Sequence, residues 1–268
     1  MNVDLARFQA VARAFGIRRR HFVEARLRYE RALIPAIRRR RTASFGRVLC
    51  YHSVGTKEWG VNDVPAPLFT SQLELALSLG YRFVPADTIA AGRGGEGDLA
   101  VTFDDGLRSV YENATPILAD LGIPWSLFIV CDWADGKHER PNLFMGWQEI
   151  RQAASAGVAI GSHSMTHPDF GRLSDADART ELTASRRVIR ERTGIDVDSF
   201  AIPLGQSCNW RSDLSELAGS VGYRNIYAQA VDTRTWGTVP RTFVTCFDGE
   251  RAFRAALEGA FDAWEESL

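Results

Sequence analysis

The chain has 268 residues, of which 45% are hydrophobic and 24% are charged, and its formal net charge at pH 7 is −1. This is the composition of an ordinary globular protein with room for a large core, built either as one barrel-type domain or as two small ones. A nearly neutral molecule has no long-range attraction for nucleic acid or for an anionic membrane, so no specific nucleic-acid partner is expected.

Charge is unevenly distributed along the chain. Between residues 1 and 47 there are thirteen arginines and three acidic residues, so the remainder is acidic. Apolar residues at helical spacing predict helices over residues 4–16 and 22–37, the second ending near Pro35, followed by an exposed linker at 38–41. These helices could pack on the main domain with exposed arginines, lie on a membrane surface, or form the arm of a homo-oligomer.

The sequence shows no clear membrane-spanning segment, secretory signal or paired-cysteine motif. No run approaches the roughly eighteen uncharged apolar residues needed to span a bilayer, and arginines interrupt every apolar run of a would-be secretory signal. The four cysteines are far apart without a CxxC pair, which favours buried free thiols. We therefore expect a cytoplasmic protein. The basic segment could in addition bring it into peripheral contact with the inner membrane face.

From residue 46 onward, strand and helix patterns alternate. Repeated strand–helix units predict an α/β protein with a parallel sheet, and seven or eight units without a phosphate-binding glycine fingerprint favour a closed (β/α) barrel. The predicted domains are a helical segment at 1–45 and a barrel at 46–268. Strands are expected at 47–52, 81–84, 99–103, 125–131, 158–160, 197–202, 225–230 and 242–246, and helices at 67–79, 108–121, 146–156, 174–193, 211–221 and 250–266.

Polar or special residues directly follow four of these strands. In a parallel barrel, the carboxyl ends of the strands share one rim, where catalytic groups lie. The residues concerned are His52, Asp104, Asp105, His163 and the segment Pro203-Leu204-Gly205.

Two of these segments suggest a metal ion. Asp104 and Asp105 repel each other, and a cation beside them would remove that penalty. Two histidines four residues apart, His163 and His167, form a common metal site when a carboxylate from elsewhere joins them. A pair of loop histidines without a metal is the competing interpretation.

The same segments resemble the motifs of the polysaccharide deacetylases, carbohydrate esterase family 4, also described as the chitooligosaccharide deacetylase homology domain. Thr102-Phe103-Asp104-Asp105-Gly106 is similar to the first motif of that family, and Ser162-His163-Ser164-Met165-Thr166-His167 to the second. Phe200-Ala201-Ile202-Pro203-Leu204-Gly205 resembles the third. The resemblance runs from about residue 47 to 245 and leaves out the arginine-rich segment.

The resemblance implies a distorted parallel barrel that removes an acetyl group from an N-acetylated sugar. It implies a divalent metal, most often zinc with cobalt, nickel or manganese as alternatives, held by Asp105, His163 and His167. Asp104 would be the general base that takes a proton from a metal-bound water. The backbone N–H of Leu204 would stabilise the oxyanion, with Pro203 lining the same groove.

Two residues of the family pattern are missing here. No histidine follows His167, so the usual general acid is absent, and His52 is the best substitute, although it could simply shape the pocket. Asp232, Asp132 and a metal-bound water are further candidates. Ala201 stands where many members have an arginine that orients the base. Arg241 is a candidate replacement, but its place at the amino end of its strand argues against it.

Aromatic residues near the rim suit stacking on sugar faces. Among them, Trp133 and Trp210 follow strand ends and are expected to bind substrate.

The predicted function is a metal-dependent carbohydrate de-N-acetylase, a hydrolase of non-peptide carbon–nitrogen bonds, in polysaccharide biosynthesis. Its substrate is expected to be a glycan, a lipid-linked saccharide or a nucleotide-linked saccharide. Two alternatives stay open: a degenerate member that binds saccharide without catalysis, and an amidase for a small non-sugar molecule.

Overall fold

The protein is described by a computed structural model covering residues 19–37, 41 and 43–265. Its main sheet contains β1 (Arg47–Tyr51), β5 (Asp98–Phe103), β6 (Trp125–Ile129), β7 (Ala159–Ser162), β8 (Ser199–Ala201), β9 (Asn225–Tyr227) and β10 (Arg241–Phe243). These seven strands are parallel and run in the order β10-β1-β5-β6-β7-β8-β9. The short strand β4 (Arg82–Phe83) pairs with β5 off this path.

The barrel closes through a narrow seam. Tyr227 at the end of β9 forms a single parallel bridge with Val239, two residues before β10 begins. The N–H of Val239 donates to Ile226 O, and the N–H of Ala228 donates to Val239 O. Because β10 pairs with β1, this segment connects the two ends of the sheet into a nearly closed barrel, as predicted.

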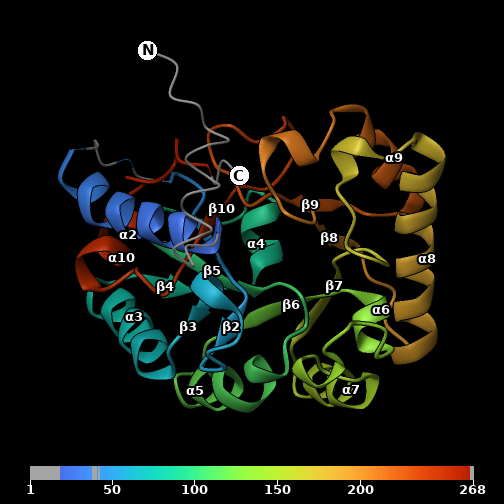
Figure 1. Cartoon of the computed structure of the whole chain (residues 1–268), viewed down its shortest axis with the longest axis horizontal. Helices are drawn as coiled ribbons and strands as arrows, with labels where there is room; N and C mark the ends of the chain where they lie inside the picture. The colour runs from blue at the N-terminus through green and yellow to red at the C-terminus, as the bar shows by residue number, and fades with distance from the viewer. Residues whose placement is uncertain (1–18, 38–40, 42, 266–268) are drawn as a thin grey trace, which may run out of the picture.

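Helices surround the barrel, and α4 (Ala86–Ala90) lies near its centre in Figure 1. Ala86 and Ile89 of α4 pack with Val48, Ala100 and Phe128, which come from the barrel strands. Helix α4 therefore covers the amino end of the barrel. The surrounding helices are α3 (Ala66–Ser78), α5 (Thr115–Asp120), α7 (Trp147–Ser155), α8 (Asp175–Thr193), α9 (Asp213–Val221) and α10 (Glu250–Leu257).

One glycine makes room inside the barrel. A Cβ on Gly161 of β7 would lie 2.5 Å from the ring of Phe128 on the neighbouring strand. Only glycine therefore lets this aromatic ring fill the interior beside the strand that leads to His163.

The helix α2 (Arg19–Ile37) packs on the barrel domain beside α10 (Figure 1). Leu27 and Ile34 are buried, which confirms packing on the main domain. The arginines were expected to be exposed, but Arg31 is buried: it ion-pairs with Asp248 at 3.5 Å and lies 4.1 Å from the Phe261 ring. The predicted helix at 4–16 and most of the 38–41 linker lie outside the described residues.

Several short elements differ from the prediction. The strand expected at 125–131 ends at Ile129, and α6 (Cys131–Ala134) begins there instead. The last helix ends at Leu257 rather than 266, just before Gly259, whose φ of 78° does not continue a helix. A separate sheet of β2 (Ser53–Val54) and β3 (Asp63–Val64) was not expected, because two-residue strands carry no periodicity.

The cysteines are free in the described chain. Cys50 and Cys131 are buried as predicted, whereas the prediction of burial is wrong for exposed Cys208 and half-buried Cys246. In the same part of the chain, no helix has the length and apolar character needed to cross a membrane.

Candidate active site

The predicted site residues meet at the carboxyl-terminal rim, where the backbone adopts an uncommon conformation. Among the described non-glycine residues, positive φ occurs at five positions, and four of them lie in this region: Asp105, Ser164, His167 and Leu204, with φ between 63° and 74°. Such conformations are costly for L-residues and cluster where a site needs a particular side-chain direction. The turns after β5, β7 and β8 are therefore shaped for these side chains rather than for local stability.

Asp105, His163 and His167 form a compact donor set. Oδ1 of Asp105 lies 3.5 Å from Nε2 of His163 and 3.7 Å from Nε2 of His167. Ligands at about 2.0–2.1 Å in a tetrahedral zinc site are roughly 3.3–3.4 Å apart, so these separations fit one ion with little adjustment. The three residues supply one carboxylate oxygen and two imidazole nitrogens, the donors expected of such a site.

The electrostatics of these three residues also suit a cation. Burial, with Asp104 adding its negative charge, raises the pKa of Asp105 to about 6. Burial lowers the pKa of His163 to about 3 and that of His167 to about 4. Both imidazoles are therefore neutral near pH 7, with lone pairs free to bind a metal, and the buried Asp105 carboxylate gains from a positive neighbour.

Outer hydrogen bonds fix two of these ligands. Nδ1 of His163 lies 2.9 Å from the carbonyl oxygen of Ala201, to which it donates, so Nε2 is left as the acceptor facing Asp105. The indole Nε1 of Trp59 donates to Oδ2 of Asp105 at 3.1 Å, which leaves Oδ1 for the histidines. Trp59 precedes the 3-10 turn η1 (Gly60–Asn62), between β2 and β3.

The loop that carries His167 is held from two sides. Glu181 of α8 accepts hydrogen bonds from the backbone N–H groups of Met165 and Thr166. Trp133 stacks on the His167 ring, with centroids 5.0 Å apart and an angle of 28° between the planes. One face of Trp133 therefore positions a metal-ligand candidate, a role that was not predicted beside the expected sugar stacking.

Asp104 forms a buried ion pair with Arg241. Nη1 and Nη2 of Arg241 donate to Oδ1 and Oδ2 of Asp104, both at 2.7 Å. Nη1 also lies 3.2 Å from Oγ1 of Thr102, and Nε donates to the carbonyl oxygen of Ala228. Arg241 is completely buried inside the barrel. Its guanidinium therefore orients the Asp104 carboxylate through two parallel hydrogen bonds.

This pair also controls the charge of Asp104. Burial alone would raise its pKa, but the Arg241 guanidinium outweighs burial and holds the pKa of Asp104 well below the usual range. The position of Arg241 at the start of β10 had argued against such a role. That argument was wrong because the long Arg241 side chain runs inside the barrel. Barrel strands are tilted, so a residue at the start of one strand can still reach a residue at the end of another.

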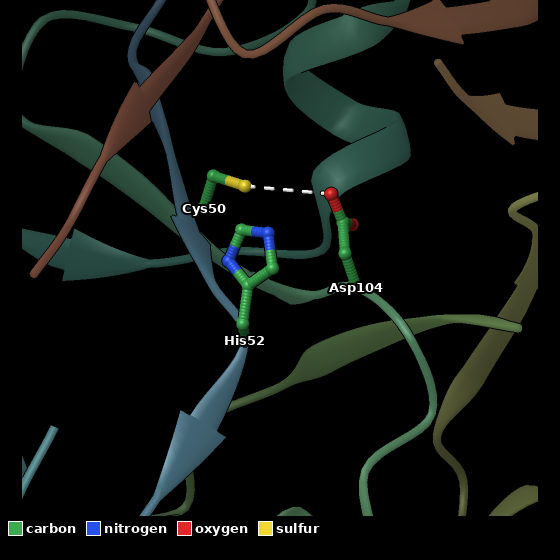
Figure 2. A group of neighbouring side chains, drawn as sticks. All are labelled: Cys50, His52 and Asp104. Carbon is green, nitrogen blue, oxygen red and sulfur yellow. Dashed lines mark hydrogen bonds between the residues drawn. The ribbon is translucent and has the colours of Figure 1, made fainter. Parts of the chain in front are cut away.

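His52 lies beside the same carboxylate. His52 directly follows β1, and Figure 2 shows its ring directed between Cys50 and Asp104. Its Nδ1 is buried and has no hydrogen-bond partner among the described residues, and the ring edge packs against Phe243. The thiol of Cys50 donates to Oδ2 of Asp104 at 3.5 Å. Burial raises the pKa of this thiol well above its usual value.

The other acid candidates are engaged elsewhere. Asp232 ion-pairs with Arg41 at 2.6 Å, and its backbone N–H donates to Asp262 O, close to Arg47 at the amino end of β1. Asp132 pairs with Lys137 at 2.6 Å. Of the candidates, His52 is the one that the structure brings next to Asp104.

The third motif presents its backbone to solvent. Leu204 is 40% exposed, with a φ of 64°, and follows Pro203 after β8. Its backbone N–H has no acceptor among the described residues, which leaves the group free to donate to an incoming oxygen.

Trp210 does not reach the site. It is 3% exposed, its ring packs against Phe170 and Phe200, and its indole N–H donates to Ser215. The expected sugar stacking is wrong for this residue, because a core ring has no face to offer. Local sequence also gave no signal for Glu181, and it gave only a general aromatic signal for Trp59, because both act across long sequence separations.

Comparisons with known proteins agree with this geometry. The family model described as "Polysaccharide deacetylase" matches residues 91–226. A chitooligosaccharide deacetylase of Sinorhizobium fredii is 26% identical over 151 residues, covering 56% of this chain and 64% of that protein, so the match spans less than two thirds of the relative.

Solved structures show the same fold. IcaB from Ammonifex degensii is 22% identical with a TM-score of 0.69, covering 82% of this chain and all of that one. The Streptococcus pyogenes deacetylase PplD is 16% identical with a TM-score of 0.68, covering 81% of this chain and 99% of that one. With a family model that covers half of the chain and a barrel of the same type, the protein belongs to the polysaccharide deacetylase family.

Proposed function

We propose that the protein is a metal-dependent hydrolase that removes an N-acyl group, in the first place acetyl, from an amino sugar. The observation that carries this proposal is that two carboxylates adjacent in sequence have different partners. Asp104 is bound by Arg241, whereas Asp105 faces His163 and His167. A site with one oriented base and one cation-binding triad suits water attack on an amide.

Each residue then has a distinct task. Asp105, His163 and His167 would hold a divalent cation, zinc in the first place, which supplies a Lewis acid and lowers the pKa of water in the site. Asp104 stays ionised beside Arg241 and accepts the proton of the attacking water. The backbone N–H of Leu204 donates to the developing oxyanion, and Pro203 fixes the turn before it.

His52 is proposed as the acid that protonates the leaving amine. Support comes from its position beside Asp104 and from its Nδ1, which has no hydrogen-bond partner among the described residues. A histidine can carry a proton near neutral pH and return it to the amine when the carbon–nitrogen bond breaks.

The substrate class is proposed from charge. The exposed arginines of the N-terminal segment, such as Arg26 and Arg28, suit a saccharide attached to a phosphate or to an anionic lipid surface. Cytoplasmic location, peripheral membrane contact and homo-oligomer formation stay predictions.

The first test is Asp104→Asn. We expect loss of deacylation by about 100-fold or more, because a positioned base contributes about 10²–10⁴-fold, with the bound metal retained. The measurements are acetate and formate release from N-acylated sugar nucleotides and lipid-linked sugars, after the metal has been identified by elemental analysis. Retained turnover would remove Asp104 as the base. A metal-free wild type that zinc and cobalt fail to activate would favour saccharide binding without catalysis.

A further inference from the structure

A second group of metal-binding atoms lies inside the barrel, next to the site described above. Cys50, His52 and Asp104, here called the inner cluster, each offer one donor atom, and these atoms lie within 4.8 Å of one another. Figure 2 shows the three side chains converging from the end of β1 and from the residue after β5. Within the described residues, the only other group of this kind is Asp105, His163 and His167.

We propose that the inner cluster is a second cation site, selective for zinc and other thiol-binding divalent ions, and that its occupation inhibits the enzyme.

The spacing of the donors fits such an ion. Sγ of Cys50 lies 3.5 Å from Oδ2 of Asp104. With Zn–S near 2.3 Å and Zn–O near 2.0–2.2 Å, tetrahedral angles place the two donors about 3.6 Å apart. An ion therefore takes the place of the thiol proton: the S–H bond breaks, a sulfur–metal bond forms, and the proton leaves to solvent.

His52 supplies the third ligand. The residue is 7% exposed, its Nδ1 has no hydrogen-bond partner among the described residues, and its ring is held by an edge contact with Phe243. Nδ1 of His52 can therefore coordinate a cation without first losing a hydrogen bond to a described residue. A buried polar atom without a partner is costly, and coordination of the ring relieves that cost.

Two features make this the weaker of the two sites. The Arg241 guanidinium already binds both oxygens of Asp104, and its positive charge opposes a cation beside them. A cation at Asp105 would add a second repulsion. The inner cluster therefore fills after the first site and at higher metal concentration. Its thiol sets it apart, because the first site offers only oxygen and nitrogen donors.

Inhibition follows from shared residues, and this part rests on the proposed function. A cation on the inner cluster occupies an oxygen of Asp104 and a nitrogen of His52, the groups assigned to accept and deliver protons. Binding itself does not depend on those roles, so it is tested separately.

The binding test uses the metal-free full chain titrated with cobalt, because a cobalt–thiolate bond gives a charge-transfer absorption in the near ultraviolet. We expect this band to grow only with the second equivalent of cobalt. Cys50→Ser should lose the band while keeping the first equivalent, and the matched control Cys208→Ser, which changes an exposed thiol, should keep both. A second equivalent without the band, or an unchanged band in Cys50→Ser, would overturn the proposal.

The inhibition test uses deacylation with excess zinc. Cys50→Ser can still donate to Asp104, and the activity of each protein with excess zinc is compared with its own activity at one equivalent of metal. The inhibition constant of Cys50→Ser for excess zinc should rise at least tenfold, since loss of even an outer partner of a metal site costs about 10–100-fold in affinity. Equal inhibition of both proteins would refute the inhibitory role. Cys50→Ala repeats both tests if the serine variant folds poorly. A protein that shows the cobalt band but no deacylation would contradict the proposed function and leave the second site standing.

Discussion

The Arg241–Asp104 pair is the most deeply buried charge pair at the site, and its geometry explains how a carboxylate stays charged inside a barrel. Both charges are out of contact with water, and each loses several kcal/mol of hydration. Two 2.7 Å hydrogen bonds, with further bonds to Thr102 and Ala228, offset that loss. Removing either partner leaves an uncompensated charge.

Replacement of Arg241 is therefore expected to change both stability and pH dependence. Arg241→Met should destabilise the fold by about 3–5 kcal/mol, and the double variant with Asp104→Asn should recover part of that loss. Arg241→Lys keeps the charge but loses the second hydrogen bond, so kcat/KM should fall about 10–100-fold. With the guanidinium gone, the pKa of Asp104 rises, so the acid limb of the pH–rate profile moves to higher pH. An unshifted limb in Arg241→Met, which removes the charge, would show that Arg241 does not set the charge of the base.

Trp59 is expected to control metal affinity, because its indole N–H orients Asp105. Trp59→Phe keeps the ring but removes the donor, and it should weaken zinc binding by about 10–100-fold in a chelator competition. Trp236→Phe is the matched control, since Trp236 is 90% exposed. Equal affinity of the two variants would contradict the role given to the indole.

Helix α2 contributes to the carboxyl-terminal rim through Arg31. The guanidinium donates to the carbonyl oxygen of Phe243, at the end of β10, and lies 4.7 Å from the Trp264 ring. The Phe243 ring in turn contacts His52. The helix is therefore part of the support behind the proposed acid and is not a loose extension.

Arg31→Met should lower the free energy of unfolding by about 3–5 kcal/mol, because Asp248 would lose its buried partner. Urea unfolding measures the change. Arg26→Met, on the exposed side of the same helix, is the control and should change stability by less than about 0.5 kcal/mol. Matching values for the two variants would show that the buried ion pair has no net effect.

The elements that sequence predicted well are those with strong local patterns. The strands before Asp104 and His163 are apolar runs that end in polar residues. Helix α8 (Asp175–Thr193) has Ser174 as its N-cap, which accepts from the Asp177 N–H, and Gly194 as its C-cap. Five-residue α4 and four-residue α6 are too short to show a helical period. The predicted 108–121 helix is divided between the π-helical turn η2 (Val110–Ala114) and the α-helix α5. The two differ in their backbone hydrogen bonding, which the spacing of apolar residues does not reveal.

The site was predictable where its residues are neighbours in sequence. The Asp104–Asp105 pair and the His163–His167 spacing each lie within a few residues. The contacts of Arg241, Trp59 and Glu181 span 137, 46 and 16 positions, respectively, and depend on how the barrel brings distant strands and loops together. The exposure of a side chain also could not be predicted, because Trp210 follows a strand as a rim residue does and is nevertheless buried.

At the scale of the whole molecule, cation binding should stabilise the fold in a pH-dependent way. The folded-state pKa of Asp105 is raised to about 6, above the usual value of about 3.9 for aspartate, so its favourable contribution is lost as pH rises through 6. A cation compensates the ionised carboxylate. Zinc should therefore raise Tm more at pH 7.5 than at pH 5, and its affinity should fall about tenfold per unit below pH 6.

Thermal unfolding of chelator-treated protein, with and without zinc, measures this effect between pH 5 and 8. His163 and His167, with pKa values of about 3 and 4, stay unprotonated in that range, so protons do not compete with the metal for their nitrogens. Equal zinc-induced shifts at pH 5 and pH 7.5 would show that Asp105 is not the proton-linked ligand.

The support of Asp104 by β10 has a consequence for how lineages of this family diverge. Many relatives are expected to carry the corresponding arginine on the third motif, where this chain has Ala201. The space beside Asp104 is filled by a guanidinium that lies 5.5 Å from the Phe128 ring and 6.0 Å from the Tyr227 ring, so it holds one arginine and not two. Relatives are therefore expected to carry an arginine at one of these two positions and not at both.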